Sequence, residues 1–559
     1  MVVRGAVIHI TSMLLASMLL TVPPHPAAGA PVVALPVLTG FVAGSGADFP
    51  AMRRSGARAV KLTADWSAIE PDRGTFHWQE LDAAVSAGAR AGLAVTLVLA
   101  YTPKWASLAT GVELRDPAIW SRQPPKRPAD WEHFVEAIAA RYKGHVRDWQ
   151  VWTVLSLPIW RGTAREYFAL VTAAKAATKA ADPGSRVILA TPHGADLISV
   201  RRALLEIPAA FDAISLNPRG LAPEALLRPL GTLRERVLAR SPKRLRIEWD
   251  PRASGERPSW SAQIVKVLAI AAAFNVERVD LAVDPAIASG ALEMVSSTVG
   301  GQPFTGYLQQ GRALAFVFGE GAPSAIAWSG AGEALLALEG EGLTAITPAG
   351  DTRAVTAEGG RSTVTVGTQP VLIKGLAASA ASAARDAMAA DASPVFAGTR
   401  EFSRATEVSA RLGKANVEEG LYNMLFRERR NGAVQAVQVG GSEAVRTDVG
   451  KDVVYVYFDV DDSFMYYVDG RYAVEVSIEV YGASAPEQLG FNLFYDSMTD
   501  LRFTRWQVVE AKDGWVTQSI RLLDAAFANT WGWDFAINAA GNRGEDLTVR
   551  SVTVRKITR

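Results

Sequence analysis

Short apolar segments with strand character alternate with segments of helical periodicity from residue 37 to about residue 285. Runs such as Leu93–Leu99 are apolar and bounded by turn residues, which favours buried strands, whereas Gln79–Ala91 repeats its apolar positions at helical spacing. The eight predicted strands are Val37–Val42, Ala59–Thr63, Leu93–Leu99, the run that begins at Asp148, Arg186–Ala190, Phe211–Leu216, Arg244–Glu248 and Arg278–Val283.

Eight strand–helix units in roughly 250 residues predict a (β/α)8 TIM barrel. The alternative, an open doubly wound sheet, calls for a glycine-rich phosphate loop after an early strand, and Gly44-Ser45-Gly46 is too weak a match. Two helix starts are also predicted. Thr163 and Glu166 have the spacing of a capping box, and Asp130 is placed to cap a helix from about Trp131 to Tyr142.

The pattern changes after the eighth unit, so the chain is predicted to be multi-domain, α/β followed by all-β. Residues 31–300 form the predicted barrel, and short alternating runs in 301–376 indicate a small antiparallel β-sandwich. Residues 377–410 are rich in Ala and Ser and are interpreted as a linker, with a short helix as the alternative. Strand-like runs in 411–559, among them Tyr472–Val480, predict a second sandwich of jelly-roll type.

The first 30 residues have the pattern of a secretory signal peptide. Arg4 precedes the apolar run Met13–Leu20, and prolines and the small residues Ala28-Gly29-Ala30 follow. An uncleaved membrane anchor is the alternative. We therefore expect a secreted, periplasmic or cell-envelope protein with no membrane attachment after cleavage.

The bulk composition narrows the classes of function. The formal net charge is +1, so no excess charge attracts nucleic acid or an anionic membrane, and 49% hydrophobic residues are enough for a large core. The absence of cysteine excludes disulfides, thiolate chemistry and Cys-ligated metals. The chain has 6 His and no cluster at metal-ligand spacing, so no metal or other cofactor is expected. The oligomeric state is left open.

Functional side chains of a TIM barrel lie at the carboxyl ends of its strands. Glu248 stands out there, because it ends the seventh predicted strand. A carboxylate in that place can act as a nucleophile or stabilise an oxocarbenium-like centre, and a structural ion pair or a helix cap is the alternative. Tryptophans at strand ends can stack on sugar rings, with core packing as the alternative. The candidate substrate-binding residues are Asp65, Trp66, Trp105, Trp152, Trp160, His193, Asn217 and Trp249.

Several segments, taken in order, resemble clan A retaining glycoside hydrolases of the β-xylosidase and exopolysaccharide hydrolase type (family 39-like or family 5-like). Trp66–Trp78 is similar to that clan's W-x-x-I-E-P-x-x-G-x-F-x-W segment, and Thr102–Ala106 to its T-P-x-W-A. Further similar segments are Arg141–Gly144, Trp149–Trp152, Leu157–Thr163, Asp212–Ser215 and Ile247–Trp249. The resemblance covers roughly residues 38 to 285. It implies a polysaccharide or oligosaccharide as partner and Glu248 as the nucleophile.

One position departs from the resembled pattern. The family's acid/base glutamate lies in a W-N-E-P-N motif, which here is Trp152-Thr153-Val154-Leu155-Ser156. The resemblance therefore implies that Val154 replaces the general acid, and valine carries no proton. No Asp or Glu lies between Trp149 and Trp160, so a shift of register does not restore it. General acid assistance typically contributes about 10²–10⁴-fold to such reactions.

Three hypotheses follow for the function. The first is an exported glycosidase whose acid comes from Asp65, Glu113, Asp116, Asp284 or the substrate. The second is a pseudoglycosidase that binds polysaccharide as a cell-envelope or biofilm structural or adhesion protein. The third is a structural protein that uses its sandwiches and keeps the barrel as a spacer.

The C-terminal region resembles jelly-roll carbohydrate-binding modules. The resemblance implies a sugar platform of Trp506, Trp515, Trp531 and Trp533, with core packing as the alternative. It also suggests Asp459, Asp461 and Asp462 as ligands of a structural calcium ion.

Overall fold

The computed structural model describes residues 37–219, 221–254, 260–347, 350–355, 357–390, 402–424, 432–467, 472–482, 489–510, 512, 514–530 and 532–558. The predicted signal peptide lies outside these residues. Among the helices described, none is both long enough and apolar enough to cross a membrane.

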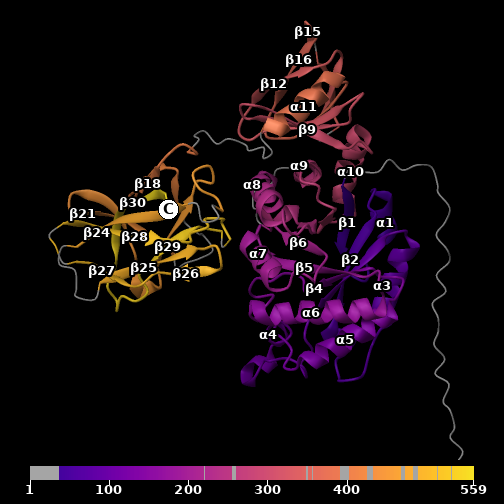
Figure 1. Cartoon of the computed structure of the whole chain (residues 1–559), viewed down its shortest axis with the longest axis horizontal. Coiled ribbons are helices and arrows are strands. Elements are labelled where there is room, and N and C mark those ends of the chain that lie inside the picture. Colours follow the sequence, from indigo (N-terminus) through magenta and orange to yellow (C-terminus); the bar gives the residue numbers. More distant parts are fainter. Residues whose placement is uncertain are drawn as a thin grey trace, which may run out of the picture. The chain divides into compact units, whose positions relative to one another are not determined.

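Eight parallel strands close into a barrel in chain order, with helices between them (Figure 1). The predicted TIM barrel is therefore confirmed. Its strands are β1 Leu38–Ala43, β2 Ala59–Asp65, β3 Ala94–Ala100, β4 Asp148–Val151, β5 Arg186–His193, β6 Ala213–Asn217, β7 Arg244–Trp249 and β8 Arg278–Leu281. Its helices are α1 Phe49–Arg54, α2 Trp66–Ile69, α3 Gln79–Arg90, α4 Pro117–Trp120, α5 Pro128–Arg141, α6 Ala164–Ala181, α7 Leu197–Glu206, α8 Leu227–Thr232, α9 Trp260–Ala273 and α10 Pro285–Val299.

The two predicted helix starts have different outcomes. Thr163 and Glu166 form the predicted capping box, because the Thr163 Oγ1 accepts from the Glu166 N–H at 3.2 Å and the Glu166 carboxylate accepts from the Thr163 N–H at 2.7 Å. The prediction that Asp130 is the N-cap of a helix from about Trp131 to Tyr142 is wrong. This helix, α5, begins earlier, at Pro128. Proline has no N–H, and the first N–H groups of a helix have no partner within the helix, so no hydrogen bond is lost there. Asp130 lies in its first turn and pairs with Arg127.

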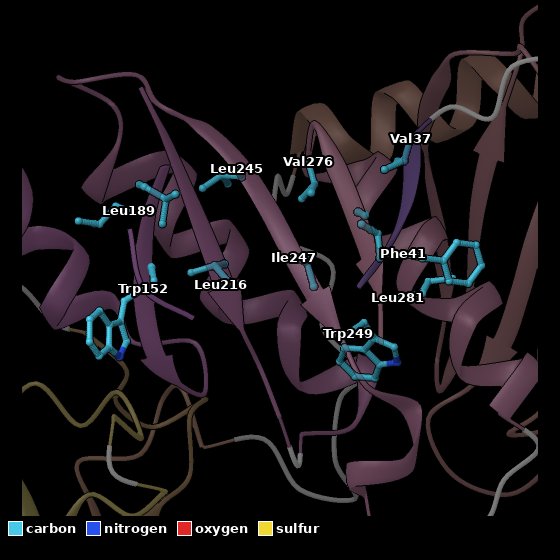
Figure 2. Packing of buried hydrophobic residues seen from close by; sticks show 14 of the residues in the cluster. Val37, Phe41, Trp152, Leu189, Leu216, Leu245, Ile247, Trp249, Val276 and Leu281 are labelled. Atoms are coloured by element: carbon cyan, nitrogen blue, oxygen red, sulfur yellow. The ribbon is translucent and has the colours of Figure 1, made fainter. Parts of the chain in front are cut away.

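The barrel sorts its side chains by alternation along each strand. Outward-facing residues such as Leu245, Ile247 and Trp249 pack in the hydrophobic layer between strands and helices (Figure 2). Many inward-facing residues are polar, charged or small, and Val98 and Ile188, level with Gln150, are apolar ones. The polar ones include Lys61, Thr96, Asp148, Gln150, Ser215, Arg246, Glu248, Arg278 and Asp280. Because barrel interiors are usually filled with branched apolar side chains, this interior is unusually charged.

An antiparallel domain follows the barrel. Its six-stranded sheet has the order β14-β13-β17-β11-β10-β9, and a three-stranded sheet has the order β12-β16-β15. The strands are β9 Phe304–Gln310, β10 Ala313–Phe318, β11 Ser324–Ser329, β12 Ala334–Glu339, β13 Leu343–Ile346, β14 Thr352–Val355, β15 Ala357–Glu358, β16 Arg361–Val366 and β17 Val371–Lys374.

The segment predicted as a linker begins with helix α11, Ala378–Ala390, which packs on this domain. Gly306 of β9 lies so close to the helix that a Cβ there would be 2.3 Å from the carbonyl oxygen of Ala384. Ala380 and Ala384 are buried in the domain core. For residues 378–390 the structure thus has the short helix given as the alternative, and its alanines allow close packing of helix on sheet. Residues 391–401 lie outside the described part.

The C-terminal region consists of two antiparallel sheets that share one core, so the predicted second β domain is present. One sheet has the order β19-β18-β30-β22-β21, with β24 and β28 added to β30; the other has the order β20-β23-β29-β25-β26, with β27 beside β25. The strands are β18 Glu407–Arg411, β19 Val417–Glu419, β20 Leu421–Met424, β21 Gln435–Val439, β22 Ser442–Arg446, β23 Tyr455–Val460, β24 Tyr472–Tyr481, β25 Gly490–Asp496, β26 Leu501–Phe503, β27 Gln507–Val508, β28 Trp515–Leu522, β29 Phe535–Asn538 and β30 Thr548–Thr558. Its jelly-roll type stays a prediction.

Candidate functional site

A cleft of about 190 Å³ opens at the carboxyl ends of the barrel strands. Strands β5, β6 and β7 place His193, Asn217 and Glu248 in its wall, and the turn after β4 adds Val154. The full lining is Thr153, Val154, Ile159, His193, Asn217, Arg219, Glu248, Asp250 and Ala282. The structure therefore brings together three of the predicted site residues and Val154, the position at which the resemblance implies an acid.

The Glu248 carboxylate is held from two sides. Lys61 Nζ on β2 lies 3.1 Å from Oε2, and the Asn217 side-chain amide donates to Oε1 at 3.1 Å. Because each oxygen has its own donor, the plane of the carboxylate is fixed. The side chain is still 20% exposed, toward the cleft. The ion pair considered as the alternative for Glu248 is thus present, with a lysine as the partner.

Lys61 connects Glu248 to a larger ionic network inside the barrel. Its ammonium group lies 3.4 Å from the Asp280 carboxylate and 3.3 Å from the Ser215 hydroxyl. Arg278 pairs with Asp280 at 2.9 Å. Nearer the amino ends of the strands, Arg186 and Arg246 pair with Asp148 and Glu277. The network, which we call the barrel ion network, contains the bases Lys61, Arg186, Arg246 and Arg278 and the acids Asp148, Glu248, Glu277 and Asp280.

The pairing keeps the carboxyl groups of Asp148 and Asp280 ionised. Burial alone would raise the pKa of Asp148, but hydrogen bonds from Arg186 and the charge of Arg246 outweigh it and lower the pKa to about 2. The pKa of Asp280 is lowered in the same way, because Arg278 and Lys61 outweigh the effect of burial. A glycine makes room for this group. At Gly40 of β1 a Cβ would lie 2.4 Å from the Asp280 Oδ1.

Apart from Glu248, the described lining of the cleft contains one further carboxylate and an apolar side chain at position 154. Val154 is 5% exposed and lines the cleft with its apolar side chain. The neighbouring Thr153 hydroxyl lies 3.3 Å from the Tyr101 hydroxyl. The second carboxylate in the lining, Asp250, accepts from the Arg252 guanidinium at 2.8 and 3.1 Å. Both carboxylates of the cleft are therefore ion-paired.

The four other acids considered as proton donors lie at helix starts. Asp65, Asp116 and Asp284 are the N-caps of α2, α4 and α10, and Glu113 belongs to a capping box. The three caps accept hydrogen bonds from the backbone N–H groups of Ser67, Ala118 and Ala286 at 2.9, 2.8 and 2.8 Å. None of the four lines the cleft that holds Glu248. The place of Asp65 and Asp284 between a strand and a helix follows from capping preference, because Asp readily accepts from the first backbone N–H groups of a helix.

The predicted sugar-binding tryptophans lie in the packing around the barrel. Trp66, Trp152, Trp160 and Trp249 are at most 4% exposed. Trp152 donates to the Ile159 carbonyl at 2.9 Å and meets Trp160 edge-on at 4.8 Å between ring centroids. Trp105 is partly buried and donates to the Glu70 carbonyl at 2.9 Å. Within the described residues the cleft wall contains no Trp, Tyr or Phe.

His193 and Arg219 also line the cleft. The His193 backbone N–H donates to the Ser156 hydroxyl at 2.7 Å. Burial, and then the charge of Arg219, lower the pKa of His193 below its usual 6.5. The imidazole is therefore neutral at neutral pH and can both donate to and accept from hydroxyl groups. Arg219 follows the end of β6 by two residues, where functional side chains gather, and its position at a strand end was visible in the sequence, but it was not chosen as a candidate substrate-binding residue.

Lys61 and Asp280 were missed as well. Their signal is a charge in the middle of a parallel strand, where both faces are normally apolar. The run Arg278-Val279-Asp280-Leu281 alternates strictly, which marks one face of β8 as charged.

Three of the four tryptophans predicted for a C-terminal sugar platform are described, and each has packing contacts within the domain. Trp533 is 5% exposed, and the Trp506 ring lies over Gly490 and Gly541. The ring of Trp515 meets that of Tyr481 edge-on, with 5.2 Å between the ring centroids, and the Arg550 guanidinium lies over the Trp515 ring in a cation–π contact. Trp531 lies outside the described residues. Across the described chain, no group of three or more His, Asp or Glu is arranged to hold a metal ion.

The chain is similar to a family 39 glycoside hydrolase from the gut symbiont Bacteroides cellulosilyticus WH2, at 14% identity over 61% of this chain and 81% of that chain, with a TM-score of 0.49. It is also similar to a glucosidase from Croceicoccus marinus (15% identity, 61% and 95%, TM-score 0.39) and to a family 30 subfamily 8 xylanase from Clostridium acetobutylicum (10%, 60% and 94%, TM-score 0.42). No protein-family model and no curated protein matches the chain. At these identities and scores the likeness carries no argument about activity, and the barrel rests on the strand pairing described above.

Proposed function

We propose that this protein is an exported polysaccharide-binding protein on a glycoside hydrolase-like barrel, which binds sugar at the Glu248 cleft and lacks two-carboxylate hydrolysis. One observation carries the proposal. Glu248, Asn217 and His193 converge on a cleft that Val154 also lines. The described lining thus offers polar groups that can recognise hydroxyls, and it has valine at the position for which the resemblance implies an acid.

The geometry of glycoside hydrolysis supports binding over turnover. Retaining enzymes place two carboxyl groups about 5–5.5 Å apart on either side of the glycosidic bond, and inverting enzymes about 6.5–9.5 Å apart. The described cleft contains Glu248 and Asp250, and both come from the end of β7. Asp250 is bonded by Arg252, so it does not face Glu248 across a bound sugar as a free acid.

A second candidate is a glycosidase restricted to substrates whose leaving group needs no acid. The ordered Glu248 carboxylate favours it, because Lys61 and Asn217 hold the plane of the carboxylate while the side chain remains exposed to the cleft. A nucleophile of this kind attacks an anomeric carbon when the departing group is already a weak base.

The two candidates are separated with dinitrophenyl glycosides, with azide as an external nucleophile. If the protein binds polysaccharide without cleaving it, we expect measurable polysaccharide affinity, no release of dinitrophenol and no glycosyl adduct in the mass spectrum of the protein. A glycosyl adduct on Glu248 that disappears in Glu248→Gln would instead establish nucleophile chemistry. If the protein binds no polysaccharide and turns over no activated sugar, both candidates fail.

A further inference from the structure

The free charge in the cleft is positive. Lys61 compensates Glu248, and Arg252 compensates Asp250. Arg219 also lines the cleft and is exposed, and in the described part of the chain its guanidinium has no ion pair and no hydrogen bond. Since His193 is neutral at neutral pH, the lining contributes one uncompensated positive charge.

We propose that the sugar residue bound beside Glu248 carries a carboxylate, as a uronic acid does, and that Arg219 binds this group. This inference rests on the function proposed above and names its substrate class. A guanidinium presents parallel N–H donors that match the two oxygens of a carboxylate. The neighbouring Asn217 and His193 offer the neutral donors and acceptors that ring hydroxyls require.

The placement of Arg219 fits recognition of an anion at the rim of the cleft. It lies two residues beyond β6, after the buried Pro218, and its backbone follows the strand that carries Asn217. Its positive charge reaches the cleft interior, because it contributes to the shift in the pKa of His193. A bound carboxylate would supply the opposite charge that no described side chain of the protein supplies.

The test compares uronate tetrasaccharides with neutral tetrasaccharides of the same linkage, by titration calorimetry on the full protein at 50 mM and 500 mM NaCl. We expect the uronates to bind about 10- to 100-fold more tightly than the neutral sugars, as a charged hydrogen bond allows. Arg219→Gln is expected to remove that advantage, and Arg219→Lys to keep part of it. High salt should weaken uronate binding in the wild type. Arg165→Gln, which removes an exposed charge from α6, is the matched control and is expected to bind as the wild type does.

Three outcomes would overturn the inference. Equal affinity for neutral and acidic sugars would leave polysaccharide binding in place but remove the uronate. If folded Arg219→Gln bound uronates as tightly as the wild type does, a group other than Arg219 would bind the uronate carboxylate. Binding of sulfated but not uronate sugars would contradict the carboxylate. Failure to bind any of the saccharides would count against the proposed function itself.

Discussion

The barrel and the C-terminal domain bury charge in opposite ways. In the barrel ion network each carboxylate contacts a base. In the C-terminal domain Asp459, Asp534 and Asp496 lie side by side on β23, at the start of β29 and on β25, and we call them the acidic row. The Asp534 N–H donates to the Phe458 carbonyl, and the Asp496 N–H donates to the Asp534 carbonyl. No ion pair reaches these three carboxyl groups from the described residues.

The two arrangements give opposite protonation. Burial raises the pKa of Asp496 to about 7, although backbone N–H groups of Thr530 and Ala528 oppose the rise. Burial, and then the charges of Asp459 and Asp496, raise the pKa of Asp534 well above its usual range. Without a partner, a buried carboxyl group takes up a proton. Pairing, more than burial, therefore decides whether the buried Asp148 and Asp496 carboxyl groups are ionised.

The largest expected effect comes from breaking the barrel ion network. Arg246→Met removes a buried base and leaves Asp148 and Glu277 with fewer partners. Loss of one partner from a buried pair typically costs about 3–5 kcal/mol, because the remaining charge is not compensated. Urea unfolding followed by tryptophan fluorescence measures the change in the free energy of unfolding.

Arg244→Gln is the control for that experiment. Arg244 also pairs with Glu277, but its side chain is 59% exposed, so the expected loss is below about 1 kcal/mol. If both variants lost equally little stability, the network would not hold the barrel in the way described.

The next effect concerns the pH dependence of the C-terminal domain. The pKa of Asp496 is raised from 3.8 to about 7 in the folded state, so folding takes up a proton between these values. The stabilisation is fully present below about pH 4 and is lost as the pH rises through 7, up to roughly 4 kcal/mol for three pKa units. Asp496→Asn is therefore expected to unfold at a higher temperature than the wild type at pH 8, and the difference should shrink at pH 5. Calorimetry between pH 5 and 8 measures it.

The barrel is expected to respond with the opposite sign. Because the pKa of Asp148 is lowered to about 2, its contribution to the free energy of unfolding is present above about pH 4 and is lost as the pH falls through 2.

The control for Asp496→Asn is Asp452→Asn, which neutralises an exposed carboxylate. It should leave the pH dependence of the unfolding temperature unchanged. Calcium and a chelator test whether a cation replaces the proton on Asp496. If the pH dependence disappears when calcium is added and returns with a chelator, a bound cation rather than a proton neutralises the acidic row.

The fold was predictable because hydrophobic periodicity reports strand and helix positions locally. The capping box of Thr163 and Glu166 was also within reach, since its two residues are three positions apart. The barrel ion network was not. Lys61 and Glu248 are 187 positions apart, and closure of the barrel alone brings β2 and β7 to face each other.

The candidate site was predicted only in part for a related reason. Position at a strand end identified Glu248, His193 and Asn217, which share the cleft. The same rule also selected Trp66 and Trp249, because it does not distinguish a side chain that faces the cleft from one that faces the helices. Side-chain direction depends on the register of each strand in the closed barrel, and a single residue of shift reverses it.

The smallest expected effect isolates burial from pairing. On the C-terminal domain Glu475 accepts from Arg521 at 3.4 Å, and the Arg521 side chain is 69% exposed. Arg521→Gln removes an arginine–carboxylate contact, as Arg246→Met does, but at the surface, so we expect a loss below about 1 kcal/mol that disappears in 0.5 M NaCl. Urea unfolding at low and high salt measures it. If Arg521→Gln lost as much stability as Arg246→Met, the contact between arginine and carboxylate, and not the burial of the pair, would determine the free energy lost in both regions.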